Sequence, residues 1–158
     1  VVERLQRAGN IHIHLDLIAG LPYEDYTSFI HSFNQVYAMR PEQLQLGFLK
    51  VLKGSYMYEH AKEYEAVYRA KPPYEVLRTK WLSYEDICNI KLAEEMLEVY
   101  YNSTQFPVSI RLLETIHESA YHMFENLGHF YEEHGYLAMS HTRMRRNSLR
   151  ICRKPWGG

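Results

Sequence analysis

Apolar and polar residues alternate over residues 11–16 of this 158-residue chain, and a period of two predicts a strand. Successive side chains of a strand point to opposite faces, so one face is apolar and the other carries His12, His14 and Asp16. A Gly20-Leu21-Pro22 corner follows and turns the chain into the next element.

The next two segments complete a βαβ unit. Residues 24–39 place apolar side chains every three or four positions, which predicts an amphipathic helix that stops at Arg40-Pro41. Residues 43–51 begin with a second alternation and predict a second strand. Strand, helix and strand in this order predict two parallel strands joined by a right-handed crossover.

The polar face of the first strand is unusual for a parallel sheet, whose strands are commonly apolar on both faces. Asp16 is expected at the carboxyl end of the strand, where α/β folds keep their chemistry. The face therefore suggests the wet lumen of a barrel. The alternative is an edge strand whose polar face meets solvent.

The rest of the chain is predicted to be mostly helical. After a turn at residues 52–55, the spacing of apolar residues predicts helices over 56–69, 84–102 and 106–126. Residues 74–81 fit either a short strand or an extended linker. The fold class is therefore α/β, with two or three parallel strands and covering helices followed by a mostly helical domain.

Composition narrows the class of protein. The net charge is −1, yet the segment from Tyr136 onward carries six basic residues and no acid: Arg143, Arg145, Arg146, Arg150, Arg153 and Lys154. Such an end suits RNA phosphate, a carboxylate surface or a solvated tail. No apolar run is as long as a membrane span, so no membrane partner is expected. The two cysteines give no disulfide framework and favour a cytoplasmic setting.

Two further groups of residues invite chemistry. The histidine pairs His117/His122 and His129/His134 are spaced by five, whereas ligands on one helix face are three or four apart, so structural roles are expected. The fourteen tyrosines suit either an aromatic binding surface or the rim of a core.

Two segments carry a family resemblance. Residues 14–25, with the run Asp-Leu-Ile-Ala-Gly-Leu-Pro, resemble the late-barrel motif of radical SAM enzymes, particularly the branch of oxygen-independent coproporphyrinogen oxidase. Residues 45–55 look like the last barrel strand and its turn in the same group. Together with residues 72–77 and 82–84, the chain is most similar to the C-terminal part of cobalamin-binding radical SAM proteins. These carry an uncharacterised helical domain and are often labelled magnesium-protoporphyrin monomethyl ester oxidative cyclases.

The resemblance implies a division of the chain and a site. Residues 1–73 would be the C-terminal βα units of a radical SAM barrel, 74–136 a helical domain of unknown function, and 137–158 a basic C-terminal tail. Asp16 would approach the ribose of S-adenosylmethionine, with His14 and Gln45 as other cofactor-binding candidates facing the lumen.

One departure limits what this chain can do alone. The family's CxxxCxxC loop, which binds the [4Fe-4S] cluster, is absent from the sequence, and Cys88 and Cys152 cannot replace it. The chain also starts without methionine, so we expect a fragment that is inactive by itself. Its cofactors would be those of a parent protein: the cluster, S-adenosylmethionine and cobalamin.

Two functions from different classes follow. In the first, the chain completes the barrel of a radical SAM enzyme and covers or regulates its substrate opening, with the N-terminal barrel and the cobalamin-binding domain as partners. In the second, it is a non-catalytic interaction module whose basic C-terminus binds RNA or a partner protein. An exposed sheet edge would also allow a homo-oligomer.

Overall fold

The structure is a computed structural model that describes residues 12–137. These residues belong to two compact units that meet in sequence between Lys91 and Leu92. The basic segment and Cys152 lie outside the described residues. The content is mixed α and β, so the predicted α/β class is confirmed.

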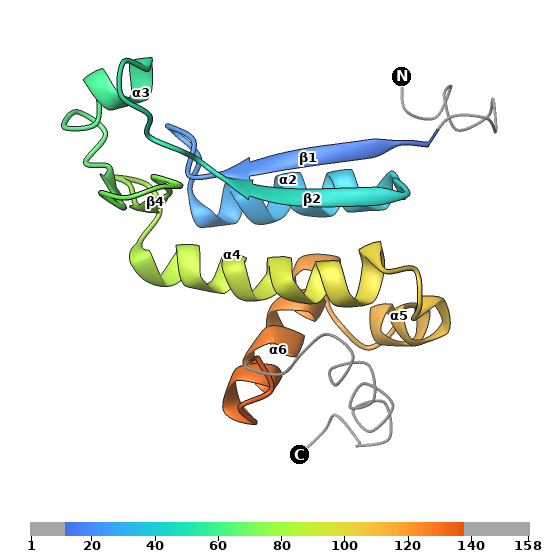
Figure 1. The fold of residues 1–158 in the computed structure, drawn as a ribbon. Helices are drawn as coiled ribbons and strands as arrows, with labels where there is room; N and C mark the ends of the chain where they lie inside the picture. The colour runs from blue at the N-terminus through green and yellow to red at the C-terminus, as the bar shows by residue number, and fades with distance from the viewer. Residues whose placement is uncertain (1–11, 138–158) are drawn as a thin grey trace. The chain divides into compact units, whose positions relative to one another are not determined.

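The first unit opens with the predicted βαβ arrangement, formed by β1 (His14–Ala19), α2 (Tyr26–Ala38) and β2 (Gln43–Phe48) (Figure 1). The two strands are parallel, with His14 opposite Gln43 and Ala19 opposite Phe48. Helix α2 begins at Asp25, whose carboxylate accepts a hydrogen bond from the Ser28 amide at 2.8 Å. The predicted parallel pairing is therefore confirmed.

The two faces of this sheet differ in burial. Phe29, Phe33 and Tyr37 of α2 are buried, and so are Leu44 and Leu46 of β2, because helix and sheet share an apolar layer. The opposite face is exposed at alternate positions of β1 and β2. In the described part of the chain, this sheet contains β1 and β2 and no further strand.

Beyond β2 the chain meets a second, smaller sheet. The Leu49 amide still donates to the Ala19 carbonyl at 2.9 Å, while the Val51 amide donates to the Tyr74 carbonyl at 3.0 Å. The Val76 amide donates to the Leu49 carbonyl at 2.9 Å. Residues 49–51 therefore lie between β1 and the segment that leads into the hairpin of β3 (Val67–Tyr68) and β4 (Val76–Arg78).

The predicted helix over 56–69 is wrong. Only α3 (Tyr56–Glu59) is helical, with the Ser55 hydroxyl accepting from the Tyr58 amide at its start. The chain then turns, and Glu65 takes a left-handed φ of 48° that no helix continues. Val67 and Tyr68 instead pair with β4, which suits a β-branched and an aromatic residue. Of residues 74–81, for which a short strand or an extended linker is expected, Val76–Arg78 form the strand β4.

Helix α4 (Tyr84–Leu97) starts as predicted, at a reciprocal cap between Ser83 and Asp86. The Ser83 amide donates to the Asp86 carboxylate at 2.8 Å, and the Asp86 amide donates to the Ser83 hydroxyl at 3.1 Å. Further along, Lys91 Nζ lies 2.9 Å from Glu75 Oε2 and 4.1 Å from the centre of the Phe48 ring. This lysine joins α4 to the end of β2 and to the hairpin.

The second unit is helical, as predicted, but its helices divide differently. Helix α4 continues into a π-helical turn, η1 (Glu98–Asn102), so the predicted helix over 84–102 is confirmed. The predicted helical stretch over 106–126 is confirmed at its start, but it consists of two helices, α5 (Pro107–Glu114) and α6 (Ala120–Glu133), and the second continues beyond residue 126. The break occurs where the Ser119 hydroxyl caps a new helix by accepting from the His122 amide.

The core of the second unit contains a buried hydrogen bond and a close approach between two helices. The hydroxyls of Tyr100 and Tyr131, both buried, lie 2.9 Å apart. Gly128 lies inside α6, beyond the predicted helix end at residue 126, and a Cβ there would be 2.7 Å from Leu92 Cβ. α6 therefore passes close to the backbone of α4 at this glycine.

No helix in residues 12–137 combines the length and the apolar character needed to cross a membrane.

Glu42 anchors the start of β1 and makes stability depend on pH. Its carboxylate accepts a hydrogen bond from the Ile13 amide at 2.8 Å, which lowers the pKa of Glu42 from its ordinary value. A lowered folded-state pKa stabilises the fold above the unfolded-state pKa, and this is lost as the pH falls through the folded-state value. We expect Glu42→Gln to flatten the acid side of the urea-midpoint profile.

The matched control for this prediction is Glu63→Gln, which removes an exposed carboxylate elsewhere in the same unit. Its profile should follow that of the wild type. A Glu42→Gln profile that also follows the wild type down to about pH 3 would show that the hydrogen bond to Ile13 does not contribute.

Candidate functional site on the exposed face of the parallel sheet

The exposed face of the parallel sheet brings together the three residues expected to form a site. His14 Nε2 lies 3.3 Å from Asp16 Oδ1, and the side chains are 46% and 67% exposed. Gln45 is the register partner of Asp16 on β2, so these two side chains leave the same face side by side. The expected place of Asp16 at the carboxyl end of its strand is wrong, because β1 continues to Ala19 and Asp16 lies in its middle. His12 is exposed and precedes β1.

This arrangement has a definite hydrogen-bonding capacity. The Asp16 carboxylate is an acceptor, the Gln45 amide can both donate and accept, and the His14 imidazole is already oriented toward Asp16. Such a set suits a ligand with neighbouring hydroxyl groups, because one carboxylate can accept from two donors. Their role in binding a cofactor stays a prediction.

The corner that follows β1 is held close to the hairpin. Gly20 has a φ of 93°, and a Cβ built on it would be 2.6 Å from Val76 Cγ1. Tyr23, in the same corner, has a φ of 67°, which is rare for a bulky side chain, and is 74% exposed. In Figure 1, α3 and β4 lie at the arrowhead end of both strands, next to this corner.

An aromatic cluster lies at this end, formed by Tyr23, Tyr56, His60, Tyr64 and Trp81. The ring of Tyr23 is 4.7 Å from that of Trp81 and 6.1 Å from that of Tyr64, measured between centroids. Tyr56 stacks on His60 at 3.8 Å. Tyr64 is buried, and its hydroxyl lies 3.3 Å from that of Tyr56, a hydrogen bond that raises the pKa of Tyr64.

The tyrosines of this cluster differ in burial, and their use as an aromatic binding surface stays a prediction. Tyr64 belongs to the core, whereas Tyr23 and Tyr56 are 74% and 61% exposed. The cluster was missed in the sequence because its members come from three separate segments. The one available signal was the position of Tyr23 and Tyr56, each just after a strand of the βαβ unit.

The same end of the first unit also holds a carboxyl group with shifted acidity. Burial raises the pKa of Glu24, against the effect of a hydrogen bond that its Oε1 accepts from the Ser32 hydroxyl at 3.4 Å. Glu24 directly follows Tyr23 and precedes the cap of α2. The Glu24 carboxyl group is therefore a polar group next to the corner that contains Gly20 and Tyr23.

In residues 12–137, no three His, Cys, Asp or Glu side chains lie close enough together to bind a metal ion or an iron–sulfur cluster. His117 and His134 each hydrogen-bond through Nδ1 to the carbonyl four residues earlier, at 2.9 and 2.8 Å. Cys88 is half-buried on α4 next to Tyr84, whose pKa its hydrogen bond raises. The donors needed for a [4Fe-4S] cluster do not fit this part of the chain.

The fold and this face define a class: a βαβ unit with an open polar face, followed in sequence by a helical unit. Comparison with known families is more specific. Residues 62–148 match the family described as protein of unknown function (DUF4080), and because the match covers more than half of the chain, the protein belongs to that family. No curated protein matches the chain.

The region that matches the family contains some of the elements described above and excludes others. The hairpin of β3 and β4 and the helices α4 to α6 lie inside residues 62–148, whereas β1, α2 and β2 lie before them. Asp16, His14 and Gln45 are thus outside the matched region.

Proposed function

We propose that β1, α2 and β2 are the last βα units of a radical SAM barrel, and that the chain completes this barrel and covers or regulates its substrate opening. One observation carries the proposal: a two-stranded parallel sheet with a helix on one face and an exposed polar face opposite. Parallel sheets are normally covered on both faces, and a barrel would supply that cover and further strands.

The polar face of the sheet suggests a cofactor-binding role for three side chains: Asp16, Gln45 and His14. In a complete barrel it would face the lumen, with Asp16 accepting hydrogen bonds from the ribose hydroxyls of S-adenosylmethionine and Gln45 beside it. His14 would orient the Asp16 carboxylate through their 3.3 Å contact. The radical chemistry belongs to a cluster on cysteines outside this chain, and a cobalamin site would belong to another domain of the parent protein.

The proposal is tested first by the reading frame on the amino-terminal side of Val1. A CxxxCxxC motif there supports it, and a frame that lacks the motif overturns it. In the protein that carries the motif, Asp16→Asn should weaken binding of S-adenosylmethionine by about tenfold, because a hydrogen bond to a charged group is lost. Iron content should stay unchanged.

The matched control is Glu63→Gln, an exposed carboxylate away from the sheet face, which should bind S-adenosylmethionine as the wild type does. Equal affinities for wild type and Asp16→Asn would remove Asp16 from the site. Within residues 12–137 no further strand pairs with the outer edges of β1 and β2, and such edges suit a homo-oligomer. Sedimentation of the chain as a strict monomer at high concentration would exclude this use of the edges.

A second candidate is a non-catalytic module whose basic C-terminus binds RNA or a partner protein. The observation in its favour is the six basic side chains without an acid after Tyr136. RNA binding that weakens steeply between low and physiological salt would support it, and no binding at low salt would remove it.

A further inference from the structure

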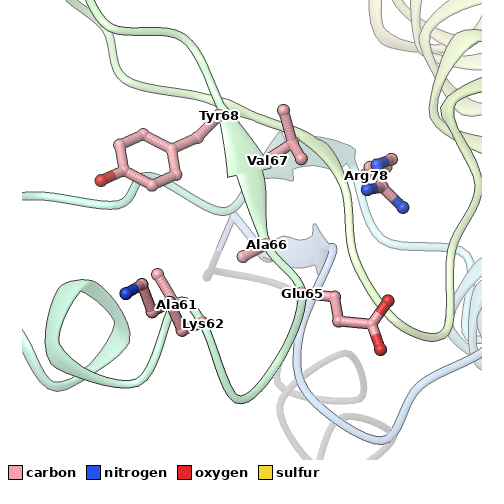
Figure 2. Close-up of a pocket in the computed structure, with 7 residues that line it drawn as sticks. All are labelled: Ala61, Lys62, Glu65, Ala66, Val67, Tyr68 and Arg78. Carbon is pink, nitrogen blue, oxygen red and sulfur yellow. The ribbon is translucent and has the colours of Figure 1, made fainter.

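A shallow, open hollow of about 430 Å³ lies against the β3–β4 hairpin (Figure 2). It is separate from the polar face of β1 and β2. Seven residues line it: Ala61, Lys62, Glu65, Ala66, Val67, Tyr68 and Arg78. All but Ala61 belong to the region that matches the family, so the hollow is a feature of that region and independent of the barrel.

Two irregularities of the backbone form the hollow. Glu65 has a φ of 48°, and the Ala66 amide donates back to the Ala61 carbonyl at 2.8 Å, so the chain reverses around residues 61–66. The pairing of β3 with β4 is then irregular between Val67 and Tyr68. Such bulges re-aim side chains, which allows two successive strand residues to line one hollow.

The lining combines an apolar middle with polar ends. Ala61, Ala66 and Val67 supply the apolar surface, and Val67 is 42% exposed. Within residues 12–137, the side chains of Lys62, Glu65, Tyr68 and Arg78 make no hydrogen bond or ion pair with one another or with a neighbour. A few polar groups around an apolar surface is the usual composition of a ligand site.

The charges are unevenly placed. In Figure 2, Lys62 and Tyr68 lie on one side of β3, and Arg78 and Glu65 lie on the other. The Glu65 carboxylate offsets the positive charge of Arg78 on their side, whereas no carboxylate among the lining residues lies on the side of Lys62. One net positive charge therefore remains, at the end of Lys62.

We propose that this hollow binds a small organic monocarboxylate, with the carboxylate at Lys62 and an apolar body on Ala61, Ala66 and Val67. A single negative charge matches the net charge of the lining. The two negative charges of a phosphate dianion would exceed the net charge of the lining. Arg78 and Glu65 are left to contact a neutral polar group of the ligand.

The test is titration of the full chain with isovalerate, its neutral analogue isovaleramide, and inorganic phosphate, followed by amide chemical shifts. Isovalerate should bind with a dissociation constant on the order of millimolar and shift residues of the hollow. Isovaleramide should bind about tenfold more weakly, because the charge-assisted hydrogen bonds are lost. Isovaleramide binding as tightly as isovalerate, or phosphate binding more tightly, overturns the proposal.

Variants locate the carboxylate. Lys62→Gln should weaken isovalerate binding by about tenfold and Arg78→Gln by about threefold or less, since Glu65 already offsets Arg78. Lys53→Gln, at an exposed lysine outside the lining, is the matched control and should leave binding unchanged. All three positions are exposed, so the fold should persist, and unchanged shift dispersion checks this. Equal weakening by Lys62→Gln and Lys53→Gln overturns the assignment of the carboxylate to Lys62.

Discussion

Gly20→Ala is expected to destabilise the first unit by about 3 kcal/mol. Two costs add at this position. The φ of 93° is strained for any residue with a Cβ, and the new Cβ would lie 2.6 Å from Val76 Cγ1, which is itself fully buried. Urea unfolding followed by circular dichroism measures the loss.

Gly54→Ala separates the two costs. Gly54 also has a positive φ, 78°, but nothing lies within 4 Å of a Cβ built there, so its loss should be about 1 kcal/mol. Equal losses at Gly20 and Gly54 would mean that the approach to Val76 costs nothing. A Gly20→Ala/Val76→Ala double variant should lose less than the sum of the single variants, because the shorter side chain relieves the overlap.

Gly128→Val is expected to destabilise the second unit by about 3 kcal/mol or more. A Cβ at Gly128 would lie 2.7 Å from Leu92 Cβ and 3.1 Å from the Leu92 carbonyl carbon and oxygen. The backbone of α4 cannot move aside as a flexible side chain could, so the helices must separate. Thermal unfolding of the chain should show a lower Tm.

Asn126→Val is the matched control on the same helix. Asn126 is exposed, and asparagine and valine have similar helix propensities, so the change should lie within about 0.5 kcal/mol. A Gly128→Val protein as stable as Asn126→Val would show that α6 does not need a glycine facing α4.

The βαβ unit could be predicted because its signals are local. A period of two in each strand, a period of three to four in α2 and a stop at Arg40-Pro41 each reflect the environment of neighbouring residues along the chain. The same holds for the start of α4, where Ser83 and Asp86 satisfy each other's amides. The strand period predicts that His14 and Asp16 share one face, whereas Gln45 and the cofactor-binding role of all three residues come from the family resemblance and stay predictions.

The features that the sequence did not predict depend on contacts between segments that are distant along the chain. Tyrosine and alanine spacing over 56–69 is compatible with a helix, but pairing with β4 outweighs that weak preference for Val67 and Tyr68. The position of Gly128 inside α6 could not be predicted either, because the residue against which it packs, Leu92, lies on a different helix. The aromatic cluster and the hollow likewise combine residues that no local pattern connects.

The two sheets of the first unit differ in how readily they could recruit another polypeptide. β3 is two residues long and its pairing is irregular, which makes it a poor template for an added strand. β1 and β2 are six residues each and regularly paired. Aggregation of the chain, where it occurs, should therefore begin at β1 or β2, and a lysine intended to improve solubility belongs on these strands and not on the hairpin.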